Sequence, residues 1–138
     1  MTTTGPAAKS LPLILARELA SNLATPMFIL DSVGTLVFYN DAAELLLGRA
    51  YGEVGEISGL QLGEMLELRD EDGGPMRRRD SPAGVAYYQR RPAHRTVQVK
   101  MLDGKHRLVE ATAYPLFGGG DMLHGVVTVF WPIGTGEG

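Results

Sequence analysis

The segment 27–48, MFILDSVGTLVFYNDAAELLLG, constrains the fold of this chain more than any other stretch. It contains two short apolar runs rich in β-forming residues, 27–30 and 36–39. Turn-forming residues occupy 31–34 between these runs, and the last of them is Gly34, which can adopt a positive φ. Two apolar runs separated by such a turn predict a β-hairpin.

Asn40 follows the second apolar run directly, where the N-cap of a helix is required. Its side-chain oxygen can accept a hydrogen bond from one of the first free backbone N–H groups of a helix over residues 41–47. Gly48 lies where that helix should end, because glycine readily takes the left-handed conformation of a C-terminal cap. We expect Asn40 to act as a structural cap rather than to bind a ligand. Its replacement by Ala should cost about 1 kcal/mol.

An amphipathic helix is expected before the hairpin, over residues 11–24, and Pro26 should end it. Leucine recurs at every fourth position of this segment: Leu11, Leu15, Leu19 and Leu23. This stripe can pack either on the chain's own sheet or on a second copy of the chain, and both alternatives stay open. Residues 1–10 are expected to be a flexible N-terminus.

The middle of the chain is expected to be helical and irregular. Four glycines in residues 51–63 predict a loop with broken helical turns, and residues 64–68 can supply one helical turn. A further helix should begin with Asp80 or Ser81 at its N-cap and end near residue 89. The acidic and basic clusters of residues 69–79 are interpreted as solvated surface.

The last third of the chain predicts three strands, over residues 96–101, 107–117 and 123–131. Asp103 and Gly104 between the first two are a strong hairpin signal. The order of elements is helix, two strands, a helical middle and three strands. It predicts an α+β fold with a five-stranded antiparallel sheet and helices covering one face. Residues 134–138 are expected to be a flexible tail.

Composition limits the classes of function. The chain has 138 residues, enough for one domain with a core, and its net charge of −3 favours neither nucleic acid nor an anionic membrane as a partner. It has no cysteine, which excludes disulfides, thiolate metal sites and cysteine nucleophiles. No apolar run is long enough to insert across a bilayer, and a cytoplasmic location is expected.

In its order of elements and its short motifs, the chain resembles a PAS domain over residues 11–133. The motifs are Asp31 and Gly34 in the first hairpin, Asn40 and Gly48 around the first short helix, Asp72-Gly73-x-Pro75-Met76, Asp80-Ser81-Pro82, Asp103-Gly104, Pro115-Leu116 and Gly125. The pattern is most similar to bacterial sensory PAS modules of kinases, phosphatases and transcription regulators. One departure is Pro132 with the glycine-rich residues after it, which disfavour a signalling helix directly after the last strand.

The resemblance implies a cavity between the sheet and the helical middle, where family members hold haem, flavin, carboxylates, fatty acids or nothing. Histidine-ligated haem is not expected, because the central helical segment of the chain, residues 40–92, contains no histidine. A cysteinyl–flavin adduct is not expected either, because the chain has no cysteine. The cofactor stays unknown at this point, and a flavin held without a covalent bond remains an alternative.

A small apolar ligand such as a fatty acid suits the apolar residues expected around that cavity. The expected lining residues are Phe28, Leu30, Phe38, Leu45, Met65, Leu66, Val85, Val97, Val99 and Met101. A carboxylate head group could meet Arg90, Arg91 or Arg95. The alternative for each of these residues is an ordinary place in the core or on the surface.

We therefore predict a non-catalytic sensor or interaction domain that forms a homodimer and signals to an unidentified protein. The expected dimer interface comprises the leucine stripe and Trp131, and transmission is expected through the N-terminal helix or the outer sheet face. The alternative is a docking or dimerisation module with a filled core and no ligand. No enzyme is expected, because His94, His106 and His124 fall near strand ends without a nucleophile or an orienting group in a recognisable pattern. No metal site is expected in the acidic turn 70–72.

Overall fold

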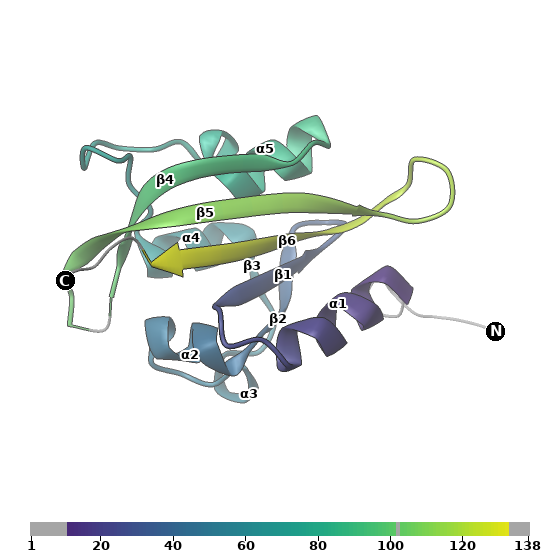
Figure 1. Ribbon diagram of the computed structural model, residues 1–138, viewed down its shortest axis with the longest axis horizontal. Coiled ribbons are helices and arrows are strands. Elements are labelled where there is room, and N and C mark those ends of the chain that lie inside the picture. Colours follow the sequence, from purple (N-terminus) through teal and green to yellow (C-terminus); the bar gives the residue numbers. More distant parts are fainter. Residues whose placement is uncertain (1–10, 102, 133–138) are drawn as a thin grey trace.

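The computed structural model describes residues 11–101 and 103–132 and shows a single antiparallel sheet with helices on both faces (Figure 1). The helices are α1 (Leu11–Ser21), α2 (Asp41–Leu47), α3 (Tyr51–Val54), α4 (Gly59–Leu66) and α5 (Pro82–Gln89), with a 3₁₀ turn η2 (Arg78–Asp80) before α5. The strands are β1 (Met27–Asp31), β2 (Thr35–Tyr39), β3 (Ile57–Ser58), β4 (Ala93–Lys100), β5 (His106–Phe117) and β6 (Leu123–Pro132). Their order in the sheet is β3-β2-β1-β6-β5-β4. The α+β class is confirmed.

The sheet has six strands rather than the expected five. The additional strand, β3, consists of two residues that pair with Thr35 and Leu36 on β2. It lies in a segment expected to be a loop, because two residues carry no periodicity of their own. The helix α4 begins at Gly59, earlier than the turn expected over 64–68, and α1 ends at Ser21 rather than at residue 24.

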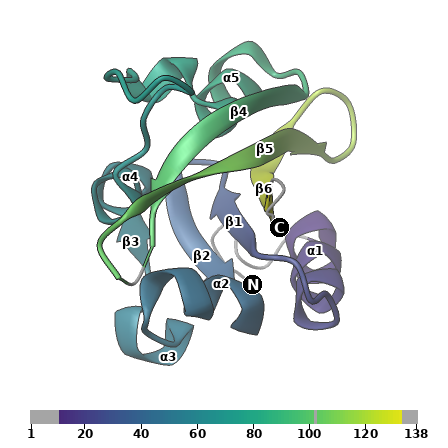
Figure 2. The same cartoon turned by 60° about the vertical axis from the view of Figure 1, so that its left-hand side comes forward.

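The sheet carries one core on each face. Phe28 and Leu66 belong to the core on the inner face, which α2, α4 and α5 cover. Leu13, Ala16 and Ala20 of α1 pack on the outer face. Figure 2 shows α1 and α4 on opposite sides of the sheet. None of the helices within residues 11–101 and 103–132 is long and apolar enough to cross a membrane.

The leucine stripe of α1 faces away from the sheet. The residues of α1 that contact the sheet follow helical spacing at positions 13, 16 and 20, which turns the stripe outward. The exposed fractions of its side chains are 64% for Leu11, 59% for Leu15, 53% for Leu19 and 36% for Leu23. Of the two alternatives for this stripe, packing on the chain's own sheet is therefore wrong.

Asn40 joins α1, β1 and α2. Its Oδ1 accepts hydrogen bonds from the backbone N–H of Ala43 (3.0 Å), as an N-cap does, and from that of Met27 (3.1 Å). Its Nδ2 donates to the carbonyl oxygens of Ala20 (3.0 Å) and Thr25 (2.9 Å). The side chain is buried, so one residue satisfies backbone groups of three segments in the interior.

A close approach between β6 and β1 requires Gly125. A Cβ atom at this position would lie 2.3 Å from the carbonyl oxygen of Leu30 and 2.8 Å from Cδ2 of Leu13. We expect Gly125→Ala to lower the free energy of unfolding by about 2–3 kcal/mol, because the strands or α1 must move apart. Chemical denaturation measures this change. Gly52→Ala is the matched control, since a Cβ there meets no atom within 4 Å and should leave stability unchanged or slightly raised.

Candidate functional site

An apolar cavity of about 240 Å³ lies between the inner sheet face and the helices α4 and α5. Most of its lining is apolar. The sheet contributes Phe28, Leu30, Val97, Ala111, Thr128 and Phe130, and the helices contribute Leu60, Leu62, Leu66, Pro82, Ala83, Tyr87 and Tyr88. This is the position expected for the ligand cavity.

Local hydrogen bonds and one close contact hold α5 over the cavity. Ser81 caps the helix, since its Oγ accepts from the backbone N–H of Gly84 (3.0 Å) and donates to the carbonyl oxygen of Arg78 (2.7 Å). Gly84 permits this approach, because a Cβ there would lie 2.2 Å from the same carbonyl oxygen. Tyr87 reaches across the cavity rim and donates its O–H to the carbonyl oxygen of Ser32 (3.1 Å).

An arginine and a tyrosine form the polar rim of the cavity. The guanidinium of Arg78 donates to the hydroxyl of Tyr88 at 3.3 Å, and both side chains line the cavity. The guanidinium of Arg79 lies 5.7 Å from the centre of the Tyr88 ring. These side chains are exposed, so a polar or anionic end of a ligand would meet positive charge at the rim rather than in the interior.

The structure brings only some of the expected lining residues to this cavity. Phe28, Leu30, Leu66 and Val97 line it. Val99 is buried in the same core but does not line the cavity. Met65, Val85 and Met101 are half-buried and do not line the cavity either.

Phe38 and Leu45 lie elsewhere, which corrects their expected place. Leu30 pairs with Leu36 whereas its neighbour Ile29 pairs with Phe38, so a bulge in β2 turns Phe38 to the outer face. There Phe38 packs beneath Arg17 of α1, whose guanidinium lies 4.7 Å from the ring centre. Leu45 is 72% exposed, because the short helix α2 turns other positions toward the core.

The three arginines expected at a ligand head group do not line the cavity, which corrects a second expectation. Arg90 donates to the carbonyl oxygen of Asp121 (3.0 Å) beyond the end of α5, and Arg91 donates to the side chain of Gln89 (3.0 Å). Arg95 is held by the carbonyl oxygen of Asp80 (3.1 Å). Arg90 and Arg91 follow the end of α5 at residue 89, whereas Arg95 lies on β4 on the same face as Val97 and is held beside the cavity by Asp80 and by Asp70 (3.4 Å).

Several polar lining residues were not expected from the sequence, among them Arg78, Tyr88 and Thr128. Arg78 belongs to a basic run interpreted as solvated surface, and Tyr88 lies near the end of the helix expected up to residue 89. Thr128 lies in the strand segment VVTVFW, which is otherwise apolar on both faces. A single hydroxyl in such a central strand is the one signal that could have found a site residue.

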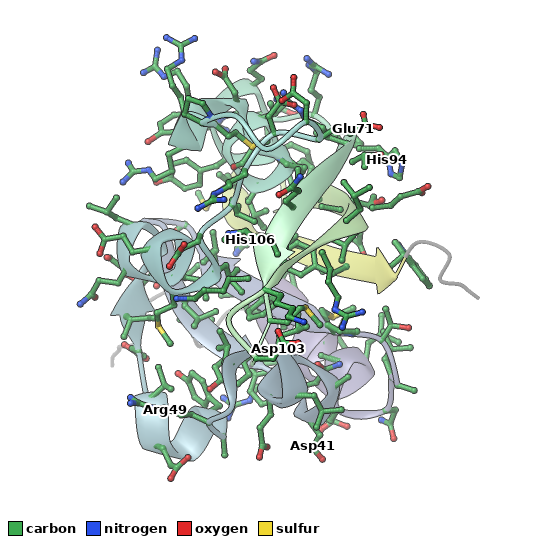
Figure 3. The ribbon with its side chains drawn as sticks, turned by 90° about the vertical axis from the view of Figure 1, so that its left-hand side faces the viewer. Asp41, Arg49, Glu71, His94, Asp103 and His106 are labelled. Carbon is green, nitrogen blue, oxygen red and sulfur yellow. The ribbon has the colours of Figure 1, made fainter. Side chains whose placement is uncertain are left out.

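The histidines do not form a site with one another. His94 approaches Thr112 and Glu110, and His106 approaches Glu67 (3.7 Å to Oε1); Figure 3 shows the two rings well apart. A hydrogen bond from Lys100 (2.7 Å) lowers the pKa of Glu67 below its ordinary value. Within residues 11–101 and 103–132, no three His, Asp or Glu side chains gather as a metal site would require.

Solved structures similar to this one are PAS and light–oxygen–voltage (LOV) proteins. The PAS domain of Bordetella pertussis BvgS is 20% identical, with 88% of this chain and 84% of that chain covered and a TM-score of 0.60. The PAS domain of nitrogen regulation protein NR(II) from Vibrio parahaemolyticus is 21% identical, with coverage of 88% and 97% and a TM-score of 0.55. The LOV protein of Rhodobacter sphaeroides is 12% identical, with coverage of 91% and 69% and a TM-score of 0.63. The sequence matches no protein-family model and no curated protein.

Proposed function

Because this chain has the PAS fold, we propose that it is a non-catalytic sensory or interaction domain of bacterial signal transduction. The observation that carries the proposal is the apolar cavity under α4 and α5, in the place where a ligand can contact both the sheet and the helices. Pockets of this kind, apolar with a few polar groups, are the common form of small-molecule sites.

We propose a small, mainly apolar ligand such as a medium-chain fatty acid. A cavity of about 150 Å³ holds benzene, and sites for drug-sized molecules begin at about 300 Å³. The volume of about 240 Å³ therefore suits one or two rings or a medium-length chain. A carboxylate at the rim would lie beside Arg78 rather than beside the three arginines named from the sequence.

The lining does not fit the larger cofactors that the fold can hold. No histidine of the described chain lines the cavity, so a histidine-ligated haem has no axial ligand there. A flavin needs many polar partners along its ring. This lining has few polar side chains, Ser58, Arg78, Ser81 and Thr128 among them, and Ser81 already makes two hydrogen bonds within the protein. A flavin-binding redox sensor is for this reason the weaker alternative.

Filling the cavity tests the ligand proposal. Ala111 lines the cavity from β5 and is 1% exposed, so Ala111→Leu places additional carbon atoms inside it. We expect this variant to bind octanoate at least about tenfold more weakly than the wild type, because the side chain occupies the ligand's space. Isothermal titration calorimetry measures the affinities, and mass spectrometry of extracts identifies any ligand that co-purifies.

Ala24→Leu is the matched control, because Ala24 is exposed and the same atoms are added outside the cavity. Equal octanoate affinities in both variants and the wild type would contradict binding in this cavity. If neither octanoate nor any co-purified molecule binds the wild type, a docking module without a ligand becomes the better description.

We also propose that the chain forms a homodimer through the leucine stripe of α1. Contiguous apolar surface of this kind on a soluble protein usually marks an interaction site. Trp131 is 48% exposed on the outer face of β6, the face on which α1 packs through Val127 and Val129. The stripe and Trp131 thus lie on the same side of the sheet and can belong to one interface.

A further inference from the structure

Four polar side chains are buried in the described part of the chain, and three of them have hydrogen-bond partners within the protein: Asp31, Asn40 and Ser81. Asp31 accepts from two backbone N–H groups of the first hairpin turn. Asn40 and Ser81 make the contacts described above. The fourth, Thr128, is 7% exposed and makes no side-chain hydrogen bond to any described residue.

Thr128 faces the cavity from the middle of the sheet. In the register it lies opposite Phe28 on one side and Ala113 on the other, and all three side chains point to the inner face. Since β6 pairs along its length with both β1 and β5, the backbone groups nearest the hydroxyl are engaged in the sheet. A hydrogen-bond partner for the hydroxyl would therefore have to be a molecule that occupies the cavity.

Burying a hydroxyl in apolar surroundings costs free energy unless the hydroxyl makes a hydrogen bond. The nearby lining is apolar and includes Phe28, Ala111 and Phe130. Valine has nearly the same shape as threonine and would fill this position without a buried hydroxyl. The threonine thus provides a hydrogen-bonding group to the cavity where packing alone does not require one.

We propose that Thr128 is a ligand-binding residue and that the ligand carries an uncharged hydrogen-bonding group, a hydroxyl or a carbonyl, on the part that enters the cavity. The threonine hydroxyl can donate to a carbonyl and can both donate to and accept from a hydroxyl. This inference rests on the proposed function of the cavity as a ligand site. It narrows the ligand class from apolar molecules in general to apolar molecules with a polar group at the inner end as well as at the rim.

Two probes of matched shape separate the hydrogen bond from apolar burial. 2-Naphthol and 2-methylnaphthalene have the same two rings, and they differ in a hydroxyl against a methyl group. We expect the wild-type chain to bind 2-naphthol about tenfold more tightly, because an unpaired buried hydroxyl is avoided only in that complex. The preference should disappear in Thr128→Val and persist in Thr128→Ser, which keeps the hydroxyl. NMR titration of backbone amides gives both dissociation constants and shows that the probe lies in the cavity.

The outcomes divide clearly. Thr128→Val should melt at or above the temperature of the wild type, so that a lost preference reflects the missing hydrogen bond rather than unfolding. Equal binding of the two probes to the wild type, or an unchanged preference in Thr128→Val, would overturn the role of Thr128 and leave the cavity as an apolar site. If octanoate binds but neither naphthalene probe does, the inference about Thr128 is wrong and the proposed ligand site stands. If neither octanoate nor either naphthalene probe binds, both the inference about Thr128 and the proposed ligand function are wrong.

Discussion

Asn40→Ala should lower the free energy of unfolding by about 3–4 kcal/mol, well above the usual cost of a lost helix cap. The cap on α2 accounts for about 1 kcal/mol of this loss. The remainder arises because the buried backbone N–H of Met27 and the half-buried carbonyl oxygen of Thr25 lose their partner, while the carbonyl oxygen of Ala20 keeps only the N–H of Leu23. Each buried group left without a partner costs about 1–3 kcal/mol, although water can relieve part of this cost. Urea denaturation followed by circular dichroism measures the change.

Two further variants separate the cap from the links to α1 and β1. Asn40→Asp keeps an oxygen that can accept from Ala43 and Met27, but its second oxygen would face the carbonyl oxygens that now accept from Nδ2, so its loss of stability should be at least as large as that of Asn40→Ala although the cap is kept. Ser58→Ala removes an exposed cap of α4 and should cost only about 1 kcal/mol. A loss for Asn40→Ala no larger than that for Ser58→Ala would show that Asn40 is only a cap.

The double substitution Leu15→Glu with Leu19→Glu should convert the proposed homodimer to a monomer. Both side chains are more than half exposed on the same face of α1, so the substitutions leave the contacts of Leu13, Ala16 and Ala20 with the sheet in place. In a dimer they would bring four carboxylates into an apolar interface, and the cost of burying unpaired charge far exceeds the loss of apolar contact. Sedimentation velocity over a range of concentrations measures the assembly state.

Leu45→Glu is the control for this experiment, because it adds one such charge at an exposed leucine on α2, which packs on the inner face. We expect this variant to sediment as the wild type does. A wild-type chain that is monomeric at every concentration would remove the dimer proposal, and a dimer that survives the double substitution would place the interface elsewhere.

Elements defined by local chemistry were predicted well from the sequence. The helices α2 and α5 begin and end where Asn40, Gly48 and the Ser81-Pro82 pair indicated, because capping depends on neighbouring residues alone. The main hairpins were also predicted, since turn residues and alternation specify them. In contrast, β3 forms only because α4 begins next to the hairpin of β1 and β2, where the N–H of Gly59 donates to the carbonyl oxygen of Gly34 (2.9 Å). A contact of this kind, between segments that are distant in the sequence, cannot be predicted from the residues of one short segment.

The site was predicted less well than the fold for a related reason. Alternation along β2 places Leu36 and Phe38 on one face, and a bulge, which depends on pairing with β1, places them on opposite faces. Arg78 reaches the cavity rim only because α5 packs closely on the turn before it at Gly84. Residues on regular strands such as Phe28 and Val97 were placed correctly, because the period of two needs no information about neighbouring strands.

The central strand β6 brings the interior and the exterior of this domain within one peptide unit of each other. Thr128 and Phe130 face the cavity, while Val127 and Val129, which alternate with them along the strand, support α1 on the other side. A small rotation of this strand about its own axis would change both surfaces at once, in opposite senses. Communication between the contents of the cavity and the outer helix then requires no chain of intermediates, because the same few residues form the wall that separates the two.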